Sequence, residues 1–273
     1  MSIAIVTGGA SGIGRAIATS LVTRGDIVIV SDVNIEGAEQ VAHKLNSVGP
    51  GKAFAVTLDV RDAEAVARLF QSVKADHGRL DLVFNNAGIV IGGLAEALTL
   101  DHWNRAIDIN LKGVVHGVHA AYPIMLEQGY GHHVNTASLA GLVPMPMGIP
   151  YTATKHAVVG LSLGLRAEAA GRGVKVSVIC PSFVDTPLLT NVNPDLPETE
   201  FSGDGGSDLK EALPKLYTAE KLARDIMRGV DKNHALIVAP ASGRAAWRGM
   251  RLTPGGAIRV AQFAVDRFRT QKD

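Results

Sequence analysis

The feature that most limits the fold is a regular alternation of short apolar runs with longer amphipathic stretches. The runs are nearly continuous in apolar residues, as expected of parallel strands covered on both faces. They lie at Ile3–Thr7, Ile27–Ser31, Ala53–Thr57, Leu80–Phe84, His133–Thr136, Val174–Ile179 and Ala235–Val238. Helical spacing between them occurs at Gly37–Asn46, Ala63–Asp76, His102–Met125, Thr152–Ala170 and Ala219–Lys232. This order predicts an α/β fold, a single doubly wound domain around a parallel seven-stranded sheet.

Composition excludes several other classes of protein. Of 273 residues, 47% are apolar and 19% are charged, which does not fit a disordered chain. Lys and Arg total 27 against 26 Asp and Glu, so the basic excess of a general nucleic-acid binder is missing. Cys180 is the single cysteine, which excludes an internal disulfide and a cysteine-based zinc site.

Targeting signals are not expected either. The first apolar run begins at Ile3, which leaves no room after Met1 for a signal or transit peptide. The sequence contains no run of 18 or more apolar residues, so we expect no transmembrane segment. Together with the single cysteine, this predicts a cytoplasmic protein.

A glycine-rich stretch, Thr7-Gly8-Gly9-Ala10-Ser11-Gly12-Ile13-Gly14, directly follows the first predicted strand and precedes a helix. Glycines there let the backbone approach a pyrophosphate, and the helix N-terminus supplies free N–H groups. Asp32 ends the second predicted strand, where a carboxylate accepts hydrogen bonds from ribose hydroxyls and repels a 2′-phosphate. No base follows at Val33, so the sequence favours NAD over NADP.

Tyr151 and Lys155 are four residues apart in one predicted helix and therefore share a face. A neighbouring ammonium favours the phenolate, so this pairing can supply a general base near neutral pH. Alone, such a pair is common on protein surfaces. Ser138 follows the strand His133–Thr136 on the side where ligands bind in such sheets.

These pieces together resemble the short-chain dehydrogenase/reductase family, in family order and with family spacing from Ile3 to about Pro240. The resemblance rests on the stretch 7–14, Asp32, Asp59-Val60, Asn85-Asn86-Ala87-Gly88, Asn110, Ser138, Tyr151 to Lys155, and Pro181 to Thr186. It implies a Rossmann-type domain, an NAD-dependent oxidoreductase, and a homodimer or homotetramer built on the helices around His102–Met125 and Thr152–Ala170. The sequence departs from the common pattern at Ser182, where glycine is frequent.

The resemblance also implies the roles of individual residues. Tyr151 is the general acid/base, Ser138 binds the substrate oxygen, and Asn110 organises a proton relay. Lys155 binds the nicotinamide ribose and lowers the pKa of the tyrosine. The remaining cofactor contacts would be Gly8, Ser11, Gly12, Ile13 and Gly14 at the pyrophosphate, Asp32 at the ribose, Asp59 and Val60 at the adenine, Asn86, Ala87 and Gly88 along the cleft, and Pro181, Val184 and Thr186 near the carboxamide.

Other reactive side chains are assigned structural roles. His116 and His119 share a helical face, and His132 and His133 are adjacent, but no carboxylate completes a metal site. We therefore predict no metal. Cys180 ends a core strand and is interpreted as a small buried hydrophobe.

The expected substrate side is apolar and free of charge. It comprises Ile89, Val90, Ile91, Leu139, Ala140, Leu142, Val143, Pro144, Met145, Pro146, Met147 and Ile149. This predicts a lipophilic secondary alcohol or ketone as substrate, although several of these residues could equally belong to the core. Two alternatives stay open: an NADPH-type carbonyl or 3-oxoacyl-thioester reductase, and a catalytically idle nucleotide-binding scaffold.

Two segments interrupt the alternation and carry opposite charge. Asp185–Tyr217 has seven acids and two lysines, whereas Pro240–Asp273 has seven bases and two acids. We predict a dehydrogenase domain over 1–240, with a substrate lid at 185–217, and a basic amphipathic extension over 241–273. The extension either docks near the lid, or lies on an anionic membrane surface, or is simply a solvated charged face.

Overall fold

The computed structural model describes residues 1–190, 193, 195–199, 201 and 216–270. Its main sheet has seven parallel strands in the order β3-β2-β1-β4-β5-β6-β9. The strands are β1 (Ile3–Thr7), β2 (Ile27–Asp32), β3 (Lys52–Thr57), β4 (Leu82–Asn85), β5 (Gly131–Thr136), β6 (Val174–Pro181) and β9 (Leu236–Ala239). The predicted α/β fold with a seven-stranded parallel sheet is therefore confirmed, and strand boundaries differ by one or two residues.

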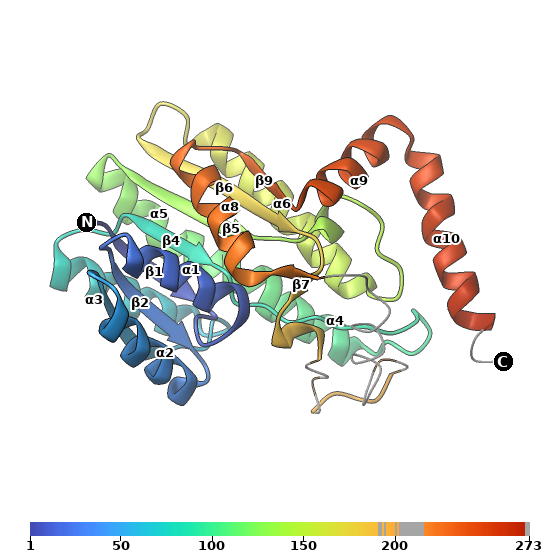
Figure 1. The fold of residues 1–273 in the computed structure, drawn as a ribbon, viewed down its shortest axis with the longest axis horizontal. Coiled ribbons are helices and arrows are strands. Elements are labelled where there is room, and N and C mark those ends of the chain that lie inside the picture. Colours follow the sequence, from blue (N-terminus) through green and yellow to red (C-terminus); the bar gives the residue numbers. More distant parts are fainter. Residues whose placement is uncertain (191–192, 194, 200, 202–215, 271–273) are drawn as a thin grey trace.

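Helices cover both faces of the sheet (Figure 1). One face carries α1 (Gly12–Thr23), α2 (Ile35–Val48) and α8 (Ala219–Asp231), and the other carries α3 (Ala63–His77), α5 (Gly113–Gln128) and α6 (Ile149–Glu168). Successive residues of β1 alternate between these two layers: Ala4 and Val6 join the first, and Ile3 and Ile5 join the second. Burial on both faces explains why the strands read as continuous apolar runs.

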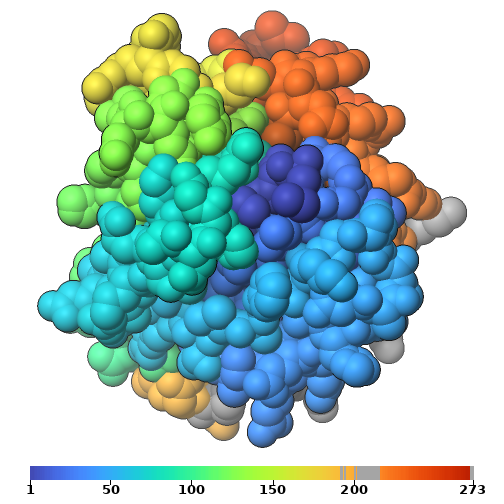
Figure 2. Space-filling model, turned by 90° about the vertical axis from the view of Figure 1, so that its left-hand side faces the viewer, coloured from blue at the N-terminus to red at the C-terminus, as the bar shows by residue number. Residues whose placement is uncertain are grey.

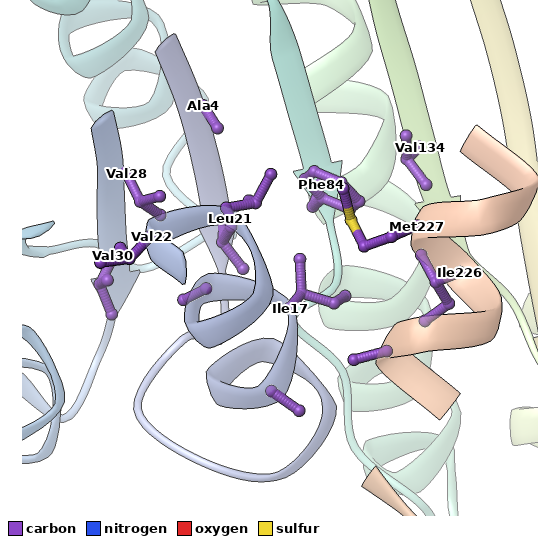
Figure 3. Packing of buried hydrophobic residues seen from close by; sticks show 14 of the residues in the cluster. Ala4, Ile17, Leu21, Val22, Val28, Val30, Phe84, Val134, Ile226 and Met227 are labelled. Carbon is purple, nitrogen blue, oxygen red and sulfur yellow. The ribbon is translucent and has the colours of Figure 1, made fainter. Parts of the chain in front are cut away.

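The contact between α1 and α8 is a large part of the first layer. Figure 3 shows Ile17 and Leu21 of α1 between the sheet residues and Ile226 and Met227 of α8. Three of these side chains are fully buried, and Met227 is 9% exposed. Figure 2 shows the end of the molecule where the dark-blue N-terminal residues border cyan and orange segments, so early and late parts of the chain lie together.

The single helix predicted at His102–Met125 is three elements in the structure. An α-helix, α4 (Leu100–Ala106), is followed by one stretch of π-helix (Ile107–Lys112), and α5 then continues. A π-helix inserts an extra residue into the turn, which apolar spacing alone does not reveal. It carries the buried Asn110.

Smaller elements lie at the carboxyl edge of the sheet. They are two 3₁₀ turns, Leu139–Gly141 and Pro187–Leu189, and a two-stranded parallel pair, β7 (Val184–Asp185) with β8 (Tyr217–Thr218). After β9 come α9 (Ala241–Leu252) and α10 (Pro254–Thr270), which stands at the edge of the molecule in Figure 1. Most of the predicted lid, at positions 191–192, 194, 200 and 202–215, lies outside the described residues.

Candidate active site

The glycine-rich turn between β1 and α1 packs against the backbone that follows β4. Gly8 has a φ of 67°, and a Cβ at this position would lie 2.8 Å from the Cα of Ala87. A Cβ on Gly14 would lie only 2.1 Å from the carbonyl oxygen of Gly8. Glycine is therefore required at both positions. The result is a concave backbone surface at a helix N-terminus, which is suited to phosphate binding.

Thr7 joins the ends of β1 and β4. Its hydroxyl accepts hydrogen bonds from the backbone N–H groups of Asn86 (2.9 Å) and Ala87 (3.0 Å). The side-chain amide of Asn86 donates in turn to the carbonyl oxygen of Thr7, at 3.0 Å. The two strand ends that border the glycine turn are thus held as one unit.

Asp32 lies at the end of β2, beside the same turn. Its carboxylate accepts hydrogen bonds from the backbone N–H groups of Ala10 and Asn34, each at 3.0 Å. These two bonds fix the carboxylate next to the glycine turn. A carboxylate in this place has the chemistry to accept hydrogen bonds from the hydroxyls of an adenosine ribose.

The loop after β3 brings a further charged pair. The Arg61 guanidinium donates to both carboxylate oxygens of Asp59, at 2.6–3.0 Å, and this hydrogen bonding holds the pKa of Asp59 below its usual range. Nδ1 of His116 lies 2.8 Å from the carbonyl oxygen of Val60, so this histidine supports the loop. Arg61 was not singled out from the sequence, although it directly follows Asp59-Val60.

Tyr151, Lys155 and Ser138 meet at the carboxyl end of β5. Tyr151 and Lys155 lie one turn apart on α6, and they are 7% and 3% exposed. The Nζ atom of Lys155 lies 5.5 Å from the centre of the Tyr151 ring and donates to the carbonyl oxygen of Thr136, at 3.0 Å. The Ser138 hydroxyl accepts a hydrogen bond from the Ala140 N–H, at 3.1 Å.

Burial dominates the electrostatics of this group. Burial raises the pKa of Tyr151, and a hydrogen bond with Ser138 only partly opposes the rise. Burial also lowers the pKa of Lys155, to about 8. Removal from water disfavours the charged form of both side chains. The expected lowering of the phenol pKa by Lys155 stays a prediction, because burial dominates the shift of each group.

Asn110 is fully buried and lies behind the group formed by Ser138, Tyr151 and Lys155. Its side-chain oxygen accepts from the Ile89 N–H (2.9 Å), and its amide donates to the Ile89 carbonyl oxygen (3.0 Å). A Cβ on Gly88 would lie 3.0 Å from the Asn110 oxygen and 3.4 Å from Nζ of Lys155. The π-helix thus holds Asn110 against the loop after β4, close to the lysine.

One cavity of about 770 Å³ joins these parts. Of the residues predicted for the site, all line it except Gly14 and Asn110: Gly8, Ser11, Gly12, Ile13, Asp32, Asp59, Val60, Asn86, Ala87, Gly88, Ser138, Tyr151, Lys155, Pro181, Val184 and Thr186. Gly14 and Asn110 each support a lining residue from behind. Arg105, on α4, also lines the cavity, and no sequence signal indicated it.

The substrate side of the cavity is largely apolar. Its lining includes Ile89, Val90, Leu139, Ala140, Val143, Pro144, Met145 and Pro146, as predicted, together with Phe183, Leu188 and Leu189. Ile91, Leu142, Met147 and Ile149 were also expected there but are absent from the lining that the described residues form. Ser182 has no positive φ, so its side chain is accommodated without backbone strain.

The described residues of the predicted lid contact the loop after β4 and helix α4. Asn193 donates to the carbonyl oxygen of Val90 at 2.8 Å, and the Thr199 hydroxyl donates to that of Gly92 at 2.8 Å. Arg105 forms an ion pair with Asp195 at 2.5 Å.

The C-terminal extension reaches the same region. The ring of Phe268 in α10 stacks on that of Phe201, with centroids 5.3 Å apart, and Arg269 lies 3.7 Å from the Glu96 carboxylate.

Among the histidines and the cysteine for which no catalytic or metal-binding role was predicted, His132, His133 and Cys180 are buried. In the described ranges, no group of three or more His, Cys, Asp or Glu side chains is arranged to hold a metal. Cys180 is fully buried, which confirms its interpretation as a core residue. Burial lowers the pKa of His132 to about 3 and of His133 to about 4. No helix in the described part of the chain has both the length and the apolar character to cross a bilayer.

Known proteins resemble this chain along most of its length. Residues 2–197 match the family described as short chain dehydrogenase. Cyclohexanol dehydrogenase of Acinetobacter sp. (strain SE19) is 37% identical over 189 residues, covering 68% of this chain and 74% of the relative. D-Threitol dehydrogenase of Mycolicibacterium smegmatis is 39% identical over 213 residues, covering 78% of each.

A solved structure agrees with these relatives. It is a short-chain dehydrogenase/reductase from Burkholderia phymatum in complex with NAD, at a TM-score of 0.85 and 30% identity, covering 93% of this chain and 94% of that one. The family match, the relatives and the shared sheet order lead to one conclusion. The chain belongs to the short-chain dehydrogenase/reductase family of oxidoreductases, which use a nicotinamide cofactor.

Proposed function

We propose that this protein uses NAD to interconvert a lipophilic secondary alcohol and its ketone. The observation that carries the proposal is the single cavity lined by Asp32, by the group Ser138, Tyr151 and Lys155, and by an apolar wall. The glycine turn, where a Cβ on Gly14 would meet the Gly8 carbonyl, fits a pyrophosphate. When bound, the cofactor supplies the acceptor or the donor of a hydride.

The chain's own residues would handle the proton and the orientation of the substrate. In alcohol oxidation, the Tyr151 phenolate accepts the hydroxyl proton as the carbon-bound hydrogen leaves with its electron pair. The Ser138 hydroxyl, which lines the cavity beside Tyr151, binds the substrate oxygen. Asn110 holds the loop after β4 through its two hydrogen bonds with Ile89, and Lys155 would bind the nicotinamide ribose. Ketone reduction follows the same path in reverse.

Cofactor choice is tested by titrating NAD and NADP separately. We expect tighter binding of NAD, because a 2′-phosphate would face the fixed Asp32 carboxylate. Asp32→Ala should narrow the difference between the dissociation constants of NAD and NADP. Adding Val33→Arg should narrow this difference further, and Val33 can be replaced because it is 65% exposed. Equal dissociation constants in the unaltered protein would favour the alternative, an NADPH-type carbonyl or 3-oxoacyl-thioester reductase.

The substrate class is tested by comparing two alcohols of different polarity. One relative is named for cyclohexanol, an apolar secondary alcohol, and another for D-threitol, a polar polyol. The apolar lining formed by Val143, Pro144 and Met145 supports the first class. We expect a higher kcat/KM with cyclohexanol than with D-threitol, measured by NADH absorbance. The reverse preference would refute the lipophilic assignment, and turnover of no alcohol would favour the idle scaffold.

Assembly into a homodimer or homotetramer through α5 and α6 is also part of the proposal. Val115 on α5 and Leu163 on α6 are large apolar side chains that are 40% and 37% exposed. Sedimentation of the whole chain at micromolar concentration should show an oligomer, and Leu163→Asp should shift it toward the monomer. A monomer before substitution would contradict this assignment.

A further inference from the structure

The last helix, α10, has one face turned toward the protein. Ala257, Ala261, Val265 and Phe268 recur at helical spacing, and all four are half-buried. Phe268 stacks on Phe201, so this face is the one that contacts the rest of the chain.

The opposite face is exposed and combines apolar side chains with arginines. Arg259, Phe263 and Arg267 follow one another at intervals of four residues, and Val260 lies next to them, three residues before Phe263. The side chains of Val260 and Phe263 are 72% and 69% exposed. Two large apolar residues on one short exposed face are unusual for a surface that only contacts water.

Positive charge is concentrated in the same two helices. Residues 241–270 contain six arginines and a single acid, Asp266. Helix α9 also carries exposed arginines: Arg248 and Arg251 are exposed, and Arg251 lies over the ring of Trp247 at 5.6 Å. Trp247 packs on the core formed by α5, α6 and β9, which attaches α9 to the body of the protein.

We propose that α9 and α10 dock on an anionic lipid surface through the face of Arg259, Val260, Phe263 and Arg267. A basic amphipathic helix inserts its apolar side chains at the boundary of headgroups and acyl chains, and its arginines bind lipid phosphates. Helix α10 stands at the edge of the molecule (Figure 1), and the exposure of Val260 and Phe263 leaves this face free to meet a flat surface. The docking is independent of the reaction proposed above.

A second copy of this chain is a poorer fit to the same face. The cores of protein–protein interfaces are depleted of charged residues, whereas here arginines alternate with the apolar side chains. A lipid surface accommodates the arginines and the apolar side chains together, because its phosphates lie directly above its acyl chains. On the side of α10 that faces the protein, Phe268 contacts Phe201 and Arg269 pairs with Glu96. Docking of α10 on lipid would therefore place the loops of the substrate side beside the membrane.

The test is cosedimentation of the full chain with vesicles of phosphatidylcholine, with and without phosphatidylglycerol. We expect binding to the anionic vesicles only, weakening as salt rises. The double variant Arg259→Gln/Arg267→Gln should lower the partition coefficient by about five-fold for each arginine removed. Val260→Ser and Phe263→Ser should each lower it by about ten-fold.

Matched controls use exposed residues at the other end of the molecule. Arg68→Gln on α3 removes an exposed arginine, and Val48→Ser at the end of α2 removes a valine that is 68% exposed. Neither should change vesicle binding. The proposal is overturned if anionic vesicles do not bind at low salt, or if the α10 variants bind as the controls do. It is also overturned if those variants alter only the oligomeric state in sedimentation, which would identify a second copy as the occupant.

Discussion

The two sides of the cavity are built in different ways. On the cofactor side, strand ends carry the site, and each part is held by more than one hydrogen bond: the Thr7 hydroxyl accepts from the N–H groups of Asn86 and Ala87, and the Asp32 carboxylate accepts from those of Ala10 and Asn34. On the substrate side, the walls come from loops after β4, β5 and β6, and single side-chain contacts such as Asn193 with Val90 connect them.

This difference predicts that the strand ends of the cofactor side tolerate little change, whereas the loops of the substrate side can vary. A shift in the strand ends would disturb the sheet itself, because Gly8 and Gly14 leave no free space. A change in the loops leaves the sheet intact, so substrate preference can vary on a constant cofactor site. Five experiments, taken from the largest expected effect to the smallest, test how far this separation holds.

Tyr151→Phe should lower the turnover rate strongly while leaving the affinity for NAD almost unchanged. Loss of the hydroxyl removes the proposed general acid/base, so we expect kcat to fall by about 10³-fold or more. The dissociation constant of NAD should change little, since Asp32 and the glycine turn are untouched. Steady-state rates and a fluorescence titration measure the two quantities. Tyr130→Phe, at a residue 41% exposed, is the control. Near-normal turnover of Tyr151→Phe would show that another group moves the proton.

The pH dependence of the rate follows from the same phenol. Because burial raises the pKa of Tyr151, the phenolate forms only in alkaline solution. Alcohol oxidation should therefore speed up as pH rises above neutral, while ketone reduction, which needs the protonated phenol, should slow down. A rate of oxidation that is flat with pH would argue against Tyr151 as the base.

Acid should lower the free energy of unfolding through the buried His133 of β5. The folded pKa of His133, about 4, lies below the ordinary value of 6.5. Unfolded chains then bind more protons between pH 6.5 and 4, so stability is full above this window and decreases as pH falls through it. The loss is about 3 kcal/mol for this residue, measurable by urea denaturation at several pH values.

His133→Leu provides the matching variant. Neither ring nitrogen of His133 has a hydrogen-bond partner among the described residues, so an apolar side chain loses no bond. The variant should be less sensitive to acid than the unaltered protein. Equal acid sensitivity of the two would mean that His133 does not titrate on unfolding.

Gly14→Ala should destabilise the cofactor side by about 2 kcal/mol, because the new Cβ would overlap the Gly8 carbonyl. Gly164→Ala in α6 is the matched control, since a Cβ there meets nothing within 4 Å. Thermal unfolding with and without NAD measures both. We expect Gly14→Ala also to weaken NAD binding. Equal melting temperatures for the two variants would mean that the turn adapts more easily than its packing indicates.

Gly249→Ala should have the smallest effect and the opposite sign. This glycine lies within α9 with nothing within 4 Å of its Cβ position. Alanine is a better helix former, so we expect a gain of about 0.5–1 kcal/mol. The cofactor affinity should not change. A loss of stability here would show that α9 packs more tightly than its exposure indicates.

The sheet was predictable because two-sided burial leaves a continuous apolar pattern in each strand. The residues lining the cavity were predictable where a motif marks them, as with Asp32 and Tyr151. Three features were not predictable, each for a physical reason. The π-helix around Asn110 adds one residue to a turn, which the apolar pattern of the surrounding helix does not mark. Arg105 has no neighbouring motif, and the raised pKa of Tyr151 depends on a degree of burial that spacing does not give.

The packing of α1 against α8 has a consequence for synthesis of the protein. Arg24, just after α1, forms an ion pair at 3.2 Å with Asp231, which lies 207 residues later. A ribosome therefore releases the apolar side of Ile17 and Leu21 long before Ile226 and Met227, which cover it, have been made (Figure 3). The growing chain must keep this surface uncovered until translation is nearly complete, which makes it a binding site for chaperones during that interval.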